Sequence, residues 1–296
     1  MTNTYTQNWQ STQPGCMIFL LDQSGSMSEK FGQAQAGRGR RKSDMVSTIL
    51  NNFLSELITI NTIPKSDGTS EVRQRADISI LGYEGTDATP VLAGALAGKD
   101  FVNLLELQVN PADMEIRTQK DYDDTGKEYE IQVPFPIWVK ARAGGGTPMC
   151  AALRRARDLA QQWAQSHPDN YPPVIVNVSD GASTDGDPTS VAREITQIST
   201  NDGQAILFNV HITNLPDAPV LYPASESEVP NDRYAKLLFS MSSVIPERSR
   251  QLLESLLGRS VAVGARGLIF NGDATSVRLM FNFASKPATV PLDPNM

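Results

Sequence analysis

Cysteine and histidine are scarce in this sequence, since each occurs only twice among 296 residues. Cys16 and Cys150 do not have the spacing of metal ligands, so both are predicted to be small buried hydrophobic residues. His167 and His211 are more typical of structural positions than of a catalytic base. A serine hydrolase needs a base within hydrogen-bonding reach of its nucleophile, and this composition therefore argues against one.

The sequence also lacks an excess of positive charge and any long apolar stretch. Its formal net charge is −7, which argues against a nucleic-acid partner, because phosphate backbones are bound by lysine and arginine. Residues 1–15 are polar without a basic start, and the apolar run that follows is far too short to span a bilayer. We expect a cytoplasmic protein that has no membrane partner.

Strands and helices alternate along the rest of the chain. Residues 16–21 form a continuous apolar run, the pattern of a strand covered on both faces, and 174–178 and 205–212 repeat it. Apolar residues recur at steps of three and four between residues 46 and 58, which predicts a helix. Ser43 or Asp44 is expected to cap its start.

The remaining expected elements continue this alternation. They are a strand at 76–83, a helix bearing Leu153 to Trp163, a helix opened by Asp187-Pro188, a helix near 248–257, a strand at 267–270 and a helix near 273–284. Strands alternating with helices predict an α/β fold of the Rossmann-like, doubly wound type. Its central sheet would be mostly parallel, with helices on both faces.

One region interrupts the alternation. Residues 113–133 form two alternating segments around the turn signal Asp123-Asp124-Thr125-Gly126, which predicts a β-hairpin within an insertion at about 90–140. The same turn resembles a calcium loop, but Gln132 stands where that loop needs a glutamate. We expect one domain at 16–285, a polar N-terminal tail at 1–15, a C-terminal tail at 286–296 and a surface loop at 214–230.

Three polar loops are expected to meet at the carboxyl edge of the sheet, where ligands collect in doubly wound folds. The first is 22–26, directly after the first strand. The second is 144–148, whose glycines allow close backbone approach and where Thr147 is expected to cap the next helix, with Pro148 behind it. The third is 179–181. Asp185 and Asp187, just beyond it, are expected to be turn and cap residues for the helix at 188.

These loops resemble the metal-ion-dependent adhesion site of the von Willebrand factor A (vWA) domain family. Asp22, Ser24 and Ser26 match its D-x-S-x-S motif, Thr147 matches its separate threonine, and Asp180 matches its late aspartate. The similarity covers about 16–285. It implies a site for Mg²⁺, or Mn²⁺, in which the three hydroxyl residues ligate directly and the two aspartates hold coordinated waters.

The resemblance also implies a function. Neutral hydroxyl ligands leave the ion electrophilic, so an aspartate or glutamate from a partner protein completes the coordination. Among intracellular members, the stretches FLLDQSGSM, GGGTPM and VSDGASTDGDP resemble the bacterial tellurite-resistance TerY-like group. Proteins of that group are associated with a protein kinase and a PP2C-type phosphatase, which implies a non-catalytic module of a signalling or stress-response assembly.

Other interpretations remain open. Each loop alone is also typical of an ordinary polar turn or helix start. A metal-dependent phosphoryl-transfer enzyme would use the same ion and carboxylates, and a metal-independent scaffold or an adaptor of an AAA+ ATPase would not need the ion. The basic segment 38–42 either lies on the rim of the site, where it would steer an acidic partner, or is a solvated loop.

Overall fold

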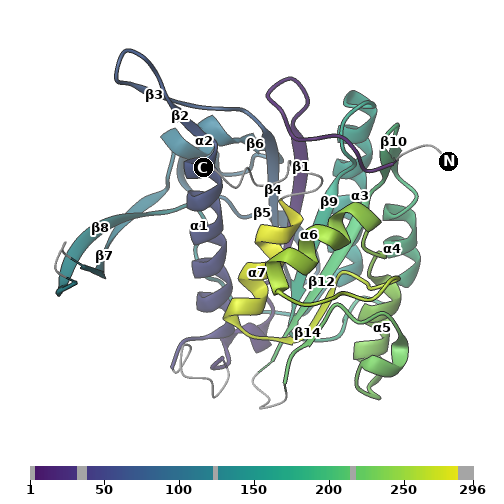
Figure 1. Cartoon of the computed structure of the whole chain (residues 1–296). Coiled ribbons are helices and arrows are strands. Elements are labelled where there is room, and N and C mark those ends of the chain that lie inside the picture. The colour runs from purple at the N-terminus through teal and green to yellow at the C-terminus, as the bar shows by residue number, and fades with distance from the viewer. Residues whose placement is uncertain (1–3, 32–38, 123–125, 214–217, 286–296) are drawn as a thin grey trace.

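A mostly parallel sheet forms the centre of the chain, so the predicted α/β class is confirmed (Figure 1). The computed structural model describes residues 4–31, 39–122, 126–213 and 218–285. Five central strands run parallel in the order β14–β12–β9–β1–β4. They are β1 (Gly15–Asp22), β4 (Ala76–Glu84), β9 (Val174–Ser179), β12 (Ile206–Ile212) and β14 (Leu268–Gly272).

Short antiparallel strands complete both edges of this sheet. β5 (Asp87–Pro90) and β6 (Val102–Asn103) pair with β4, and β13 (Val220–Leu221) pairs with β14. Small two-stranded sheets lie outside it: β2 (Thr62–Pro64) with β3 (Ser70–Val72), β7 (Asp113–Tyr122) with β8 (Glu128–Ile137), and β10 (Ser199–Thr200) with β11 (Gly203–Gln204). Three 3₁₀ turns are described at η1 (Gly25–Ser28), η2 (Gly94–Leu96) and η3 (Glu226–Glu228).

Helices cover both faces of the sheet because its strands are apolar on both sides. In β1, Met17, Phe19 and Leu21 face one core, while the intervening Ile18 and Leu20 face the other. The first core contains residues of α1 (Lys42–Ile60), α2 (Leu104–Val109), α6 (Glu247–Leu257) and α7 (Ala274–Ala284). The second face carries α3 (Met149–Ser166), α4 (Thr189–Ile195) and α5 (Arg233–Met241).

Three aromatic rings join α1 and α7 to the sheet. Phe19 of β1, Phe53 of α1 and Phe281 of α7 are fully buried, with ring centroids 5.0–5.8 Å apart in edge-on contacts. Edge-to-face aromatic pairs add about 0.5–1.5 kcal/mol each to the burial of their surface. This cluster fixes the helix whose first residue, Lys42, reaches the carboxyl edge of the sheet.

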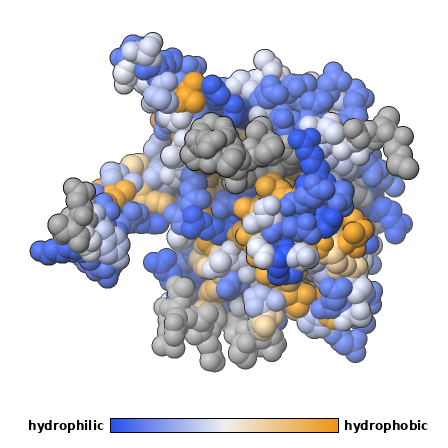
Figure 2. All heavy atoms as spheres, viewed as in Figure 1, coloured by the Kyte–Doolittle hydropathy of each residue, from blue (hydrophilic) through white to orange (hydrophobic). Residues whose placement is uncertain are grey.

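The predicted hairpin lies away from this body. β7 and β8 pair over ten residues each and project to the left in Figure 1. Met114 is 50% and Ile116 is 65% exposed, and apolar colour marks the hairpin in Figure 2. The ladder extends to Ile137, beyond the predicted end at 133, and turn residues 123–125 lie outside the described residues.

The segment predicted as an N-terminal tail lies against the body. Trp9 is 7% exposed and packs in the first core, while the backbone of Thr6 and Gln7 donates to the Asp202 carboxylate at 2.8 and 3.1 Å. The predicted C-terminal tail, 286–296, lies outside the described residues. In the described part of the chain, no helix has the length and apolar character needed to cross a membrane.

Candidate functional site

The candidate site lies at the carboxyl ends of β1 and β9, two neighbouring central strands. The chain leaves β1 toward β4 on one side and later returns through β9 on the other, so the strand order reverses here. Clefts at such reversals are the usual ligand sites of doubly wound sheets. The register pairs Leu21 with Val178, and Asp22 and Ser179 therefore follow side by side.

Asp22 is buried at the back of the site. Its Oδ1 accepts a 2.8 Å hydrogen bond from the Ser24 backbone N–H, and its Oδ2 accepts one of 2.8 Å from the Ser179 hydroxyl. Burial raises the pKa of Asp22, and the hydrogen bonds from Ser24 and Ser179 act in the opposite direction. The carboxylate is thus held in one orientation, behind the serines that follow it.

A line of oxygen atoms crosses the site from β1 to β9. The hydroxyls of Ser24 and Ser26 are 3.0 Å apart, and the Ser26 hydroxyl donates to Asp180 Oδ1 at 2.7 Å. Ser24 is 2% exposed, Ser26 is half-buried, and the Asp180 side chain is buried. Four of the five predicted residues are therefore connected directly: Asp22, Ser24, Ser26 and Asp180.

The loop that contains the fifth residue, Thr147, is fastened to the first loop through the backbone. Gly25 N–H donates to Gly145 C=O at 3.0 Å, and Gly144 N–H donates to Gln23 C=O at 2.7 Å. Gly145 has φ +69°, and a Cβ there would lie 2.7 Å from Gly85 N, so the position requires glycine. Thr147 is 6% exposed, and its hydroxyl has no hydrogen-bond partner among the described residues.

The prediction that Thr147 caps the following helix was wrong. α3 begins at Met149, and Pro148 occupies the cap position without a side-chain bond. Asp185 supplies the missing acceptors, since its two oxygens accept from Cys150 N–H at 2.9 Å and Ala151 N–H at 2.8 Å. A cap from a distant loop satisfies the first N–H groups of a helix as well as a local one does.

Asp187 has the role that was predicted for it, because it accepts from the backbone N–H and hydroxyl of Thr189 at the start of α4. Asp185 was expected to serve that same helix, and this part of the prediction was wrong. Thr184, between Gly181 and these aspartates, bonds with the Thr147 backbone in both directions at 2.9 and 3.0 Å. The loop after β9 therefore holds the Thr147 loop in place.

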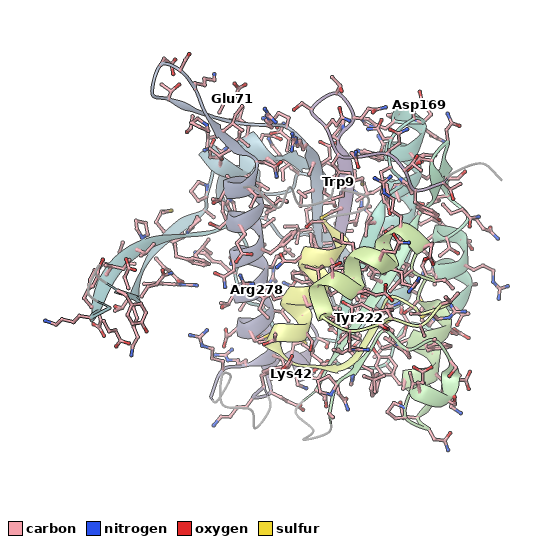
Figure 3. The ribbon with its side chains drawn as sticks, viewed as in Figure 1. Trp9, Lys42, Glu71, Asp169, Tyr222 and Arg278 are labelled. Atoms are coloured by element: carbon pink, nitrogen blue, oxygen red, sulfur yellow. The ribbon has the colours of Figure 1, made fainter. Side chains whose placement is uncertain are left out.

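Lys42 occupies a position that neither interpretation of the basic segment 38–42 anticipated. It is the first residue of α1, its side chain is 5% exposed, and its ammonium group lies 2.8 Å from Asp180 Oδ2 and 2.9 Å from Glu29 Oε2. Figure 3 places Lys42 in the lower part of the molecule, well below Trp9. Burial lowers the pKa of Lys42, but the ion pairs with Asp180 and Glu29 outweigh it and leave the pKa raised.

The rest of that segment is exposed where it is described. Arg40 and Arg41 precede α1 at the surface, and residues 32–38 lie outside the described residues. The Arg41 backbone N–H donates to Asp44 at 3.3 Å, so Asp44 serves the helix start from its third position and Ser43 does not cap it. Nothing in the basic segment 38–42 indicated that its last residue, Lys42, is buried.

Tyr234 is a further residue of the site that sequence patterns did not indicate. Its hydroxyl donates to the Ser179 hydroxyl at 3.1 Å, and Ser179 donates to Asp22. The residue lies at the start of α5, which was not predicted, although Asp232 before it is a typical cap and accepts from the N–H groups of Tyr234 and Ala235.

Neither histidine is bonded to the serines of the site. His211 stacks on Phe270 and its Nδ1 accepts weakly from Asn271 N–H, while His167 Nδ1 lies 3.0 Å from the Trp163 carbonyl. Burial lowers the pKa of His211 to about 4. Within the described residues, no hydrogen bond joins either ring to Ser24 or Ser26.

The donor set differs from that of a carboxylate-rich or histidine-rich metal centre. Among the described residues, no three histidine, cysteine, aspartate or glutamate side chains gather in a way that could hold a metal ion. The site instead offers the hydroxyls of Ser24, Ser26 and Thr147 with two carboxylates close by. These hard oxygen donors fit Mg²⁺ or Mn²⁺, which accept oxygen ligands and retain several waters.

A small hollow lies beside Asp22, lined also by Met27 and Val139. The hollow beside Asp22 has a volume of about 10 Å³, whereas small-molecule sites usually measure about 300–1,000 Å³. A larger hollow of about 670 Å³, lined by Arg193, Arg266 and Ile206, lies at the amino end of β12. That end is the edge of the sheet opposite the candidate site.

No family model and no curated protein matches the chain. Solved structures with weak similarity include proximal thread matrix protein 1 from the mussel byssus, with 11% identity and a TM-score of 0.38 over 70% of this chain and 39% of that one. The PilB minor pilin from Streptococcus sanguinis has 15% identity and a TM-score of 0.32, over 57% and 30% of the two chains. The chain therefore spans well under half the length of these two proteins.

An uncharacterized membrane spanning protein from Vibrio fischeri is a third, with 17% identity and a TM-score of 0.28, over 68% of this chain and 71% of that one. All three TM-scores are low, so none of these proteins indicates a function for this chain.

Proposed function

We propose that this chain is a vWA-like domain that binds a partner protein through Mg²⁺, with an aspartate or glutamate of the partner completing the site. The observation that carries the proposal is the connected line from Ser24 through Ser26 to Asp180, at the reversal of strand order. Asp22 accepts from the Ser24 backbone N–H, and the Thr147 hydroxyl, on the loop fastened to the first one, has no hydrogen-bond partner among the described residues.

The residues have different parts in this proposal. Ser24, Ser26 and Thr147 would hold the ion through their hydroxyls, and Asp22 and Asp180 would hold its waters; Mn²⁺ would be accepted in place of Mg²⁺. The bound ion would supply a positive charge at the surface that attracts a carboxylate. Asp22 fixes the backbone of Ser24 through the 2.8 Å hydrogen bond, so the first hydroxyl is oriented before a ligand arrives.

The partner that we infer is a macromolecule. A hollow of about 10 Å³ beside Asp22 does not enclose a small molecule, whereas a side chain presented on another protein surface needs no enclosed cavity. Arg40 and Arg41 are exposed at the start of α1 and would attract an acidic partner over a longer range. The proposed setting is a cytoplasmic TerY-like signalling assembly that contains a protein kinase and a PP2C-type phosphatase.

The first experiment measures binding of Mg²⁺ and Mn²⁺ to the purified chain by calorimetry. We expect Ser24→Ala and Ser26→Ala each to weaken binding at least tenfold, because each removes a hydroxyl ligand. Ser28→Ala is the matched control: Ser28 lies in the same turn, but its hydroxyl donates to Gly25 C=O at 2.7 Å and should not affect binding. Equal binding by all four proteins would overturn the proposal.

The second experiment tests the partner. The chain is used as bait in the host lysate with Mg²⁺, with EDTA, and as Ser24→Ala, and retained proteins are identified by mass spectrometry. A partner that is retained only with Mg²⁺ and the intact serine supports metal-dependent binding. A partner retained equally in all three conditions would place the binding surface elsewhere.

A further inference from the structure

The Lys42 ammonium is a positive charge built into the candidate site. It lies 2.8 Å from Asp180 Oδ2, and its side chain is only 5% exposed, while that of Asp180 is fully buried. Buried ion pairs of this kind are held firmly, because removing one partner leaves the other charge without compensation. Glu29, the second partner at 2.9 Å, has a side chain that is 53% exposed.

The two oxygens of Asp180 face different groups. Oδ1 accepts from Ser26, within the line of hydroxyls, whereas Oδ2 accepts from Lys42. Lys42 therefore leaves Oδ1 directed toward the serines and holds Oδ2 on the other side. This division allows Lys42 to remain paired with Asp180 when a ligand is bound near Ser26.

The charge balance of the site follows from this pair. Asp22 and Asp180 each contribute one negative charge, and Lys42 cancels one of them. These three buried side chains thus supply a single net negative charge to a divalent cation, whereas the charge of Glu29, which also pairs with Lys42, is 53% exposed and largely screened by solvent. Without Lys42, the two carboxylates would balance such a cation fully, and an anion from outside would gain less by approaching it.

We propose, on the basis of the function proposed above, that Lys42 is a positioning residue that directs Asp180 Oδ1 into the site and, by cancelling one carboxylate charge, makes the site depend on a carboxylate from the partner. The Lys42–Asp180 pair thereby sets the chemical class of that partner as an acidic surface side chain. It also weakens binding of the cation alone, so that cation and partner stabilise each other's binding.

The test measures Mn²⁺ binding by electron paramagnetic resonance, with and without acetate as the carboxylate probe, at constant ionic strength. For the wild type we expect acetate to tighten Mn²⁺ binding. For Lys42→Gln we expect Mn²⁺ alone to bind at least about fivefold more tightly and acetate to add little. Lys42→Arg keeps the charge and should preserve the effect of acetate. Lys65→Gln removes an exposed lysine paired with Glu71 and controls for net charge.

Glu29→Gln gives an independent test in a variant that changes only a half-exposed side chain. It removes negative charge beside Lys42, so we expect Mn²⁺ alone to bind about two- to threefold more weakly and acetate to help more. The decisive result is that Lys42→Gln tightens Mn²⁺ binding whereas Glu29→Gln weakens it, since a purely structural role of Lys42 predicts no such opposite effects. If Lys42→Gln does not fold, Glu29→Gln and Lys42→Arg carry the test.

The outcomes separate this inference from the function on which it rests. A wild type that fails to bind Mn²⁺ overturns the proposed function and this inference with it. Mn²⁺ binding by the wild type together with unchanged affinity in Glu29→Gln, or an equal effect of acetate in Lys42→Gln and the wild type, overturns the role of Lys42 alone.

Discussion

The Tyr234 hydroxyl donates a 3.1 Å hydrogen bond to the Ser179 hydroxyl, which itself donates to Asp22 Oδ2 at 2.8 Å. This relay connects α5 with the buried carboxylate behind the site. The Ser179 hydroxyl also accepts a 3.2 Å hydrogen bond from the Gly181 backbone N–H, so it joins the ends of β1 and β9 to the loop after β9. A displacement of α5 would therefore change the position of the Asp22 carboxylate.

We expect Tyr234→Phe to lower the free energy of unfolding by about 1 kcal/mol, the usual contribution of one hydrogen bond, and to weaken Mg²⁺ binding several-fold by loosening Asp22. Urea denaturation and calorimetry measure the two effects. Tyr5→Phe is the matched control, because the Tyr5 hydroxyl donates to the Gln204 carbonyl at 3.2 Å, just before β12 and at the opposite edge of the sheet. It should cost similar stability and leave Mg²⁺ binding intact. Equal Mg²⁺ binding by both variants would show that the relay does not orient Asp22.

Gly145→Ala is expected to destabilise the chain by about 1–3 kcal/mol. Alanine is strained at φ +69°, and its Cβ would meet the backbone N of Gly85 at 2.7 Å. The Gly25 N–H to Gly145 C=O bond would be disturbed as well. Gly68→Ala separates the causes, since Gly68 has φ +82° and a Cβ added there would meet nothing within 4 Å. A cost that is no larger at Gly145 than at Gly68 would show that the contact with Gly85 is unimportant.

Asp185→Ala should destabilise the chain by about 1–2 kcal/mol, because it removes the acceptors for two N–H groups at the start of α3. Asp187→Ala removes the corresponding acceptor at α4, which has seven residues where α3 has eighteen, and should cost less. Thermal unfolding of the two variants gives the comparison. A larger loss in Asp187→Ala would contradict the role assigned to Asp185.

The spacing of apolar residues predicted the central strands and helices, because the faces that each element buries determine that spacing. The run 16–21 is apolar at every position since β1 is covered on both faces, and the helix at 46–58 repeats at three and four residues since one side of α1 packs on β1. The loops after β1 and β9 could be placed at one edge for the same reason. A parallel sheet puts Asp22 and Asp180 at the same edge, and they lie in one site because β9 is directly beside β1.

The pairings across the site could not be read from spacing. Lys42 is 138 residues from Asp180 along the chain, and a basic run gives no sign of which member turns inward. Asp185 looked like a local cap for α4, but the approach of two loops makes it the cap of α3. Such contacts depend on how loops close in three dimensions, which local propensity does not encode.

His211 should make stability depend on pH between about 4 and 6.5. The ring is 7% exposed in β12, and burial lowers its pKa to about 4, although Asp180 and Asp232 nearby act to raise it. The unfolded chain, with a histidine pKa near 6.5, binds more protons in this range than the folded chain does. The free energy of unfolding therefore rises with pH in this range. On account of this residue it falls by about 2 kcal/mol from pH 7 to pH 5.

Urea denaturation at pH 7 and pH 5 should show a smaller fall in the free energy of unfolding for His211→Gln than for the wild type. His167→Gln, whose ring stacks on Trp163, serves as the control. An equal fall in the wild type and His211→Gln would mean that this ring is protonated in the folded chain as readily as in the unfolded one.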